Sequence, residues 1–319
     1  MKKFLFFLFA AMVIGSWAIV ADESTLIDFT LLDADPDKTE MDYSVAAGAS
    51  FTDEQKGLMK TNLALPNWEV VLNNSAHNAE AVANSGVKSA KVKDSVQSTI
   101  GSSAAGKTVM GVRVRFPESA VNANARIIPP FEIPAYEGYD GSENAKTKFE
   151  DGYGVVKNVG TIKSMKVTVF GNSYPHGLYV ILKDTDGIER RYFMGYLNFD
   201  GWKVLEWVNP HYMVNVRDRE LRPYPVYPRG LPFVKFVGFQ ITRDAGDAGG
   251  DFISYFKDVS ITYDLAVLSR ERDIADEDLW GIIKQKEDAR QRREVQRFGA
   301  LQVERFIEQE KMHKEPEEQ

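Results

Sequence analysis

The sequence contains no cysteine, which excludes disulfides, thiolate metal ligands and cysteine nucleophiles. It has only four histidines, and no two of them have metal-ligand spacing: His77, His176, His211 and His313. A Walker loop, a GxSxG elbow and a GxGxxG turn that opens a helix are also missing. We therefore expect a protein that is stabilised by core packing, with no cofactor and no metal.

Basic residues are outnumbered by acidic ones, 39 to 46, so the formal net charge is −7. An acidic chain is a poor partner for nucleic acid or for an anionic membrane surface. A glycosidase needs two carboxylates at a set separation, and no local motif selects such a pair here. We therefore expect no enzymatic activity.

Long apolar runs are absent except at the N-terminus. Phe4–Ile14 is an unbroken apolar run of 11 residues that follows two lysines and precedes small residues. It is too short to span a bilayer as a stable helix and has the layout of a secretory signal. Cleavage could follow Ala18 or Ala21, and the polar residues from Asp22 onward favour Ala21. The sequence predicts an exported chain whose residues 1–21 are removed.

Alternation of apolar and polar residues dominates residues 22–268. In TVMGVRVRF (108–116), Met110, Val112 and Val114 share one face. Similar stretches occur at 25–32, 68–73, 162–171, 178–184, 190–199, 202–208, 233–244 and 252–265. No regular helix-strand alternation separates them. The pattern predicts an all-β fold, an antiparallel β-sandwich of jelly-roll type.

Turns are marked by two Asp-Gly pairs, Asp186-Gly187 and Asp200-Gly201, which fall between these stretches. Glycine supplies the positive φ that tight hairpins need. We expect a hairpin at each pair.

Two segments interrupt the strand pattern. Residues 74–107 are rich in Ala, Ser, Asn, Gly and Lys and predict a long inserted loop, with or without a short helix. Residues 222–232 alternate prolines with Tyr224 and Tyr227 and continue to Arg229, which favours an extended polyproline-like path. The proline segment either caps the sandwich or presents its tyrosines and Arg229 to a partner.

The tail, residues 269–319, is dense in charges of both signs. Apolar residues recur in it at helical spacing, as a candidate contact stripe of Leu279, Ile282, Ile283, Phe298, Leu301 and Phe306. This predicts a charged amphipathic helical extension. Folding back on the sandwich and docking on another subunit both remain open.

Aromatic residues gather in LNFDGWKVLEWVNPHY (197–212), which contains Trp202, Trp207 and Tyr212. Such rings can stack on sugars or contact a partner. Because the two tryptophans are five residues apart, a regular strand places them on opposite faces. At most one of them then serves a flat platform, unless a bulge intervenes.

Several blocks resemble a known family. They are FPESAVNANARIIPPFEIPAYEG (116–138), GVVKNVGTIKSMKVTVFGNSYPHGLYVILKD (154–184), RYFMGYLNFDGWKVLEWVNPHY (191–212), RELRPYPVYPRGLPFVKF (219–236) and GGDFISYFKDVSITYD (249–264). Together these ordered blocks resemble the spirochaete flagellar filament outer-layer (sheath) proteins of the FlaA type.

The resemblance implies a structural, non-enzymatic subunit of the periplasmic flagellum. Its partners would be flagellin-type core subunits, neighbouring copies or other sheath proteins, and a glycan on the core is a further option. Assembly around the core would tune filament stiffness, curvature and motility. The implied sandwich is similar to galactose-binding-like carbohydrate modules. The alternative is therefore an exported carbohydrate-binding module for cell-wall or filament glycans.

Overall fold

The computed structural model describes residues 22–118, 121–135, 148–185, 187–212 and 232–265, and in the tail residues 280–281, 285, 289, 299–305 and 307–308. Several residues named above lie outside the described part: the expected signal segment 1–21, Tyr224, Tyr227, Arg229, Leu279, Ile282, Ile283, Phe298 and Phe306. No helix among the described residues is long and apolar enough to cross a membrane.

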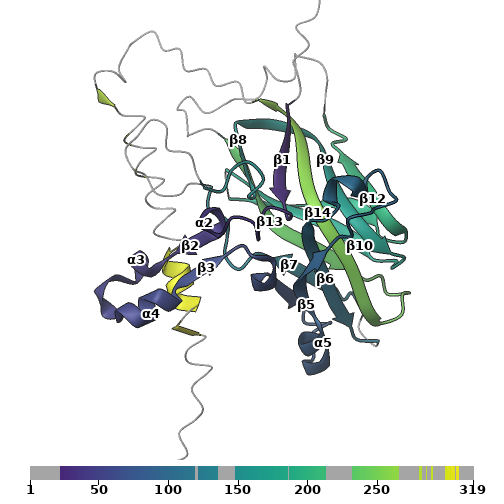
Figure 1. Ribbon diagram of the computed structural model, residues 1–319, viewed down its shortest axis with the longest axis horizontal. Coiled ribbons are helices and arrows are strands. Elements are labelled where there is room, and N and C mark those ends of the chain that lie inside the picture. Colours follow the sequence, from purple (N-terminus) through teal and green to yellow (C-terminus); the bar gives the residue numbers. More distant parts are fainter. Residues whose placement is uncertain are drawn as a thin grey trace, which may run out of the picture.

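Two six-stranded antiparallel sheets form a β-sandwich (Figure 1). The first sheet has the order β12-β9-β14-β6-β5, with β1 also on β14: β12 (Asp200–Val208), β9 (Val159–Asn172), β14 (Gly250–Leu265), β6 (Thr108–Phe116), β5 (Gly86–Lys91) and β1 (Asp22–Asp28). The second has the order β11-β10-β13-β7-β4, with β8 also on β13: β11 (Glu189–Tyr196), β10 (Gly177–Asp184), β13 (Phe233–Thr242), β7 (Asn124–Ile128), β4 (Glu69–Leu72) and β8 (Val155–Lys157). The predicted antiparallel β-sandwich is confirmed.

The longest strand in each sheet holds two short strands end to end along one edge. On β14, Gly250–Phe256 pairs with β6, and Asp258–Tyr263 pairs with β1. On β13, β7 pairs with Phe239–Thr242 and β8 with Phe233–Lys235. The first strand of the chain is thus held by the last strand of the sandwich.

Short helices and a small two-stranded sheet lie together at one end of the molecule (Figure 1). They are α2 (Pro36–Thr39), β2 (Glu40–Asp42), α3 (Ser44–Ala47), η1 (Gly48–Ser50), α4 (Asp53–Leu58) and β3 (Lys60–Asn62). A capping box begins α4, because Thr52 Oγ1 accepts from the Gln55 N–H and the Gln55 side chain accepts from the Thr52 N–H. After β3, η2 (Leu65–Asn67) returns the chain to the second sheet.

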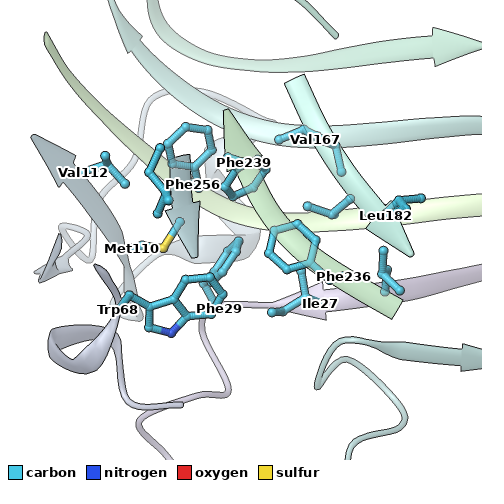
Figure 2. Close-up of a cluster of buried hydrophobic side chains, with 14 of the residues drawn as sticks. Ile27, Phe29, Trp68, Met110, Val112, Val167, Leu182, Phe236, Phe239 and Phe256 are labelled. Carbon is cyan, nitrogen blue, oxygen red and sulfur yellow. The ribbon is translucent and has the colours of Figure 1, made fainter. Parts of the chain in front are cut away.

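The core between the sheets is aromatic (Figure 2). Phe239 of the second sheet stacks on Phe256 of the first, with ring centroids 4.5 Å apart. Phe29 contacts Trp68 edge-on at 5.4 Å, and the Trp68 indole donates to the Leu63 carbonyl at 2.9 Å. Large rings from both sheets therefore fill the interior without leaving a buried donor unpaired at Trp68.

Strand predictions from alternation agree with the structure. The stretch 108–116 is β6 with the same bounds, and the long stretches at 162–171, 233–244 and 252–265 lie within or overlap β9, β13 and β14. Besides β5, which lies in the segment 74–107, four strands had no prediction: β2, β3, β7 and β8. Each of these has only three to five residues, too few for a period to show.

The hairpin expected at Asp200-Gly201 is wrong. Strand β11 pairs with β10 and β12 pairs with β9, so residues 197–199 carry the chain from one sheet to the other. Gly201 does have a positive φ of 93°, but it lies inside β12. Buried Leu197 and its N–H bond to the His176 carbonyl at 2.9 Å hold the crossing in place. At the other pair, Gly187 has φ 78° between antiparallel β10 and β11.

The prediction of a loop over residues 74–107 is also wrong in part. The segment contains α5 (Ala79–Asn84), strand β5 and η3 (Gly101–Ala104). Strand β5 escapes recognition because it is an edge strand that pairs only with β6 and exposes Lys88, Ser89 and Lys91. Lysines on an edge strand are typical, since they prevent pairing with another chain.

Candidate partner-binding surfaces

Trp202 begins a row of residues that crosses five strands on the outer face of the first sheet. Strand pairing aligns Trp202, Phe170, Tyr255, Gly111 and Lys88, which we call the first-sheet row. The Trp202 and Phe170 rings meet edge-on at 5.5 Å, and Phe170 meets Tyr255 at 5.9 Å. All three aromatic residues are half-buried, so this row is already packed.

The chain itself covers the Trp202 end of this row. Gly101 in η3 is buried, and a Cβ added to it would lie 2.3 Å from Trp202 Cδ1 and 2.6 Å from Nε1. It would also lie 2.8 Å from Val96 Cγ1. Only glycine allows this close approach, so Trp202 is a contact for the inserted segment and not a free sugar platform.

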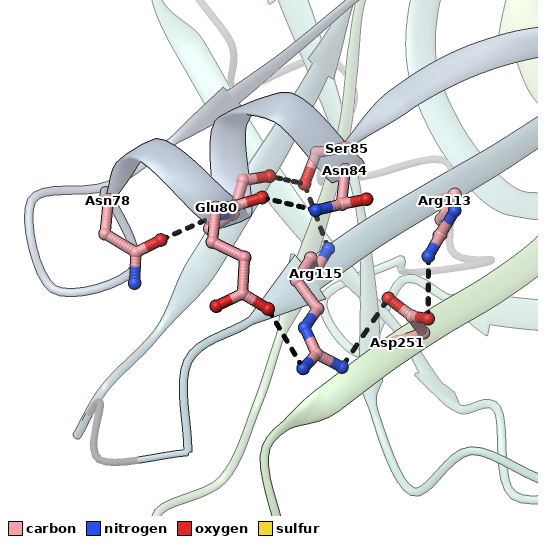
Figure 3. A network of polar contacts seen from close by, with 8 residues as sticks. Asn78, Glu80, Asn84, Ser85, Arg113, Arg115 and Asp251 are labelled. Carbon is pink, nitrogen blue, oxygen red and sulfur yellow. Dashed lines mark hydrogen bonds and ion pairs between the residues drawn. The ribbon is translucent and has the colours of Figure 1, made fainter.

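A polar network fixes the start of the same inserted segment (Figure 3). Asn78 caps α5 by accepting from the Ala81 N–H at 2.7 Å. Arg115 on β6 forms ion pairs with Glu80 of α5 at 3.2 Å and with Asp251 of β14 at 3.8 Å. The Arg115 N–H also donates to Ser85 Oγ at 2.9 Å. The segment that reaches Trp202 is thus tied to two strands of the first sheet.

Trp207 lies on the opposite face of β12, as alternation predicted. Its ring meets Tyr192 of β11 at 4.7 Å, and both side chains pack against the core. This pair closes the side of the sandwich where the chain crosses between the sheets. The register of β12 on β9 has no bulge, so the two tryptophans cannot form one platform.

Tyr212 and Leu301 are the other candidates in the described part. Lys163 Nζ lies 5.5 Å from the centre of the Tyr212 ring, and the Tyr212 N–H donates to the Asn209 carbonyl at 3.1 Å. Leu301 is 46% exposed on the tail helix. The structure does not bring either residue together with Trp202 or Trp207.

A second row crosses the outer face of the second sheet. Strand pairing aligns Phe193, Tyr179, Gln240, Arg126 and Val71, which we call the second-sheet row. Phe193 is 40% exposed and the neighbouring Tyr196 is 46% exposed. The Phe193 side chain is therefore more exposed than that of Trp202, which is half-buried.

Sequence reasoning missed this second row. In RRYFMGY (190–196) both faces of the strand carry an aromatic ring, Tyr192 inward and Phe193 outward. Alternation alone could not say which ring is buried. The available signal was Arg191, because a charged residue two positions before Phe193 marks that face as the outer one.

Beside the second-sheet row, an ion triad holds one end of the second sheet. Glu132 Oε1 accepts from Lys183 Nζ at 2.7 Å and from Lys235 Nζ at 2.8 Å. Lys235 is almost fully buried. Although burial alone would raise it, the pKa of Glu132 falls to about 2 because both ammonium groups stabilise the carboxylate.

His176 is buried at the same end of the sandwich as the 243–249 loop. Its ring stacks on Phe116 at 5.1 Å and lies 5.0 Å from Phe252. Neither ring nitrogen has a hydrogen-bond partner among the described residues. Burial lowers the pKa of His176 to about 4, and the charges of Asp247, Arg243 and Asp244 have smaller effects. The imidazole is therefore neutral at pH 7 and acts as a core ring.

The described part of the tail contacts its own sandwich. Arg305 Nη1 donates to the Pro130 carbonyl at 2.8 Å, and Nη2 pairs with Glu69 on β4. Gln302, one turn earlier, is 7% exposed. These contacts involve polar groups of the helix, whereas the Leu301 side chain is 46% exposed.

No group of three or more His, Asp or Glu side chains among the described residues could hold a metal ion. The two described groups with the largest pKa shifts, Glu132 and His176, each have a structural explanation given above. What the described surface offers is contact area, in particular the exposed rings beside Arg191 and Gln240.

Sequence comparison identifies relatives over nearly the full chain. Residues 33–272 match the family model described as flagellar filament outer layer protein. Two curated proteins named flagellar filament outer layer protein are 52% identical in Treponema pallidum (98% of this chain, 95% of the relative) and 43% identical in Spirochaeta aurantia (99% and 94%). A protein of the same name in Borreliella burgdorferi is 34% identical over 81% of this chain and 73% of its own length.

Solved structures show weaker likeness. A carbohydrate-binding module in complex with β-1,4-galactotriose matches with a TM-score of 0.25 and 14% identity, over 61% of this chain and 88% of that module. A family 11 carbohydrate-binding module of a Clostridium thermocellum cellulase matches with a TM-score of 0.28 and 10% identity, over 64% and 91%. Likeness at this level says nothing about function.

Proposed function

The chain belongs to the family of flagellar filament outer layer proteins and has a structural role in that layer, and from this premise we propose that it is an exported, non-enzymatic sheath subunit of the periplasmic flagellum. It packs around a core of flagellin-type subunits and beside neighbouring copies or other sheath proteins. The observation that carries the proposal is the 52% identity with an outer layer protein over 98% of this chain. Heterologous contacts that do not close allow such a subunit to follow a helical filament.

Purified filaments provide the test. Antibody raised against this protein is expected to label isolated periplasmic filaments along their length, and the protein is expected to co-sediment with them. A periplasmic marker enzyme in the same extract serves as the control for trapped soluble protein. Recovery of the protein only as a free monomer, with unlabelled filaments, would contradict the proposal.

Export is tested separately, because residues 1–21 lie outside the described structure. We expect the N-terminus of the filament-associated protein to be Asp22, with Ile19 as the start if cleavage follows Ala18. N-terminal sequencing of the protein from filaments distinguishes these two results. An intact Met1 on filament-associated protein would refute removal of the segment.

The tail is proposed to fold back on its own subunit and to help assembly. The contacts of Arg305 with Pro130 and Glu69 support folding back. Deleting residues 270–319 is expected to leave the sandwich folded but to weaken incorporation into filaments. Loss of the cooperative thermal transition would show instead that the core requires the tail. Arg305→Ala in the full chain is the milder companion variant and tests the docking contact alone.

The proline segment is a second proposed contact. Tyr224→Ala and Tyr227→Ala are expected to lower assembly without lowering the thermal midpoint if the tyrosines face a partner. If the segment caps the sandwich, the same variants lower the thermal midpoint and leave assembly of the folded fraction unchanged. Arg229→Gln, measured in the same assembly assay, tests the contribution of the positive charge at that position of the segment.

A further inference from the structure

The outer face of the second sheet carries a group of exposed rings. Phe193 meets Tyr179 at 5.0 Å and Tyr196 at 5.3 Å, and Phe193 and Tyr196 are the two exposed members. The Tyr196 hydroxyl donates to Asp244 Oδ2 at 3.3 Å, which orients the ring. Below them Gly177 has no side chain, and a Cβ there would lie 3.3 Å from the Phe193 ring. The rings are therefore supported from beneath and open above.

Planar polar groups continue from the rings across the sheet. Arg191 Nη1 donates to Gln240 Oε1 at 3.2 Å, and Gln240 Nε2 donates to Asn124 Oδ1 at 3.1 Å. Gln240 is only 7% exposed although it lies on the outer face, so its neighbours hold it in one orientation. The bond to Gln240 therefore orients the Arg191 guanidinium, whose other N–H groups can donate to a ligand.

Arg191 differs from the other cations of this face in its charge balance. Arg126 pairs with Glu189 at 3.1 Å, and Lys183 and Lys235 share Glu132. Among the described residues, Arg191 has no carboxylate partner and its bond to Gln240 leaves the charge uncompensated. An unpaired guanidinium is locally complementary to a carboxylate, which it can bind through two parallel hydrogen bonds.

We propose that this face binds an acidic oligosaccharide. The apolar face of a sugar ring lies on Phe193 and Tyr196, and a sugar carboxylate pairs with Arg191, which Gln240 holds in place. A folded protein partner fits less well, because its interface would need a continuous apolar centre, whereas here rings alternate with ordered polar groups. The site does not depend on the sheath role, and it replaces Trp202 and Trp207 as the sugar-binding candidate.

The test is an array of uronic-acid and muramic-acid oligosaccharides, each beside its carboxyl-reduced counterpart. The full-length exported protein is expected to bind acidic members and to bind the reduced ones at least about tenfold more weakly, as loss of a charge-assisted pair implies. Phe193→Ala and Arg191→Gln are each expected to lower affinity by about tenfold or more.

Two matched controls keep the result specific. Arg190→Gln removes a cation from the same strand, where Arg190 pairs with Asp184 at 2.6 Å instead of facing the rings. Trp280→Ala removes an aromatic residue of the tail that is 63% exposed and, among the described residues, has no contact with the rings of the second sheet. Both variants are expected to bind like the wild type, and circular dichroism checks that every variant is folded.

The proposal is overturned if the wild-type protein retains no acidic oligosaccharide, or if Phe193→Ala and Arg191→Gln bind as well as the controls. Equal binding of carboxyl-reduced sugars overturns the acidic specificity. Antibody labelling of filaments by the Arg191→Gln protein separates this site from the sheath role. If the Arg191→Gln protein is found on filaments but does not bind sugar, the sheath role stands and the two functions are separate.

Discussion

The outer faces of the two sheets carry the same arrangement of aligned residues but differ in how far the first ring of the row is exposed. On each, strand pairing aligns a row across five strands that starts with an aromatic residue on an edge strand, Trp202 in the first sheet and Phe193 in the second. The Trp202 ring is covered by Gly101 of the inserted segment. The Phe193 ring is 40% exposed, and no described segment packs over it.

This difference shows that an insertion, not the strand pattern, decides which face can meet a partner. The segment between α5 and β6 is tied down through Arg115 and reaches Trp202. We infer that the aromatic residues of the first-sheet row contribute mainly to stability and that Phe193 and Tyr196 are accessible to a ligand.

The largest expected effect on stability comes from the ion triad of Glu132, Lys183 and Lys235 in the second sheet. Glu132→Gln leaves Lys235 buried without a carboxylate and is expected to lower the free energy of unfolding by about 3 kcal/mol. Urea denaturation measures it. Glu23→Gln, which removes a carboxylate from an exposed pair with Lys166, is the control and should change stability by less than about 0.5 kcal/mol. Equal effects would show that the triad does not hold the sheet.

Alanine variants of Trp202 and Phe193 test directly whether the two rings differ in their contribution to stability. Trp202→Ala is expected to lower the free energy of unfolding by about 2 kcal/mol, less than for a fully buried tryptophan because Trp202 is half-buried. Phe193→Ala should lower it by less than about 1 kcal/mol. Thermal and urea unfolding measure both. If Phe193→Ala proved the more damaging change, the second face would be structural and the assignment would be reversed.

The inserted segment can cover Trp202 only because residue 101 is glycine. Gly101→Ala forces the inserted segment and Trp202 apart and is expected to cost about 1.5 kcal/mol, with a red shift of tryptophan fluorescence as the ring meets water. Gly57→Ala is the matched control, since no atom lies within 4 Å of its Cβ position and the site is helical. That variant should be neutral or slightly stabilising.

Acid is expected to lower the stability of the folded protein through buried His176, without changing the exposure of Trp202 or Phe193. The pKa of His176 is about 4 in the folded protein and 6.5 when exposed, so between these values the unfolded state binds more protons. Stability is then lost as the pH falls from 6.5 to 4. Lowering the pH from 7.5 to 5.5 is expected to cost about 1 kcal/mol from this group.

Two variants check the assignment of that acid response. His176→Phe keeps a ring between Phe116 and Phe252 and should remove the pH dependence above pH 4.5. His77→Gln, which changes an exposed histidine, should retain it. Below pH 4.5 both proteins should still lose stability, because the pKa of Glu132 is held at about 2. An unchanged profile in His176→Phe would assign the response to another group.

Strand periodicity predicted the sandwich because most long strands bury one face. β6 shows this clearly, with Met110, Val112 and Val114 inward and Arg113 outward. Periodicity could not find β5, whose side chains are mostly polar on both faces, or β7 and β8, which are too short. It also could not tell that residues 197–199 change sheets, since a hairpin and a crossing have the same local pattern.

The candidate surface was harder to predict than the fold. The sequence indicated that Trp202 and Trp207 face opposite ways, but covering of Trp202 depends on Gly101, which is 101 residues earlier in the chain. Likewise Arg191, Gln240 and Asn124 come from three separate strands. Contacts between such distant positions follow from sheet order, which local patterns do not contain.

Pairing of β1 with β14 determines when the first sheet can be completed during synthesis of the chain. The first strand, which begins at Asp22, has its partner in Asp258–Tyr263, so it waits for nearly the whole chain before it can be paired. Contacts of such long separation form slowly, because loop closure must precede them. The first sheet of the sandwich is therefore completed only after its last strand, β14, has been synthesised.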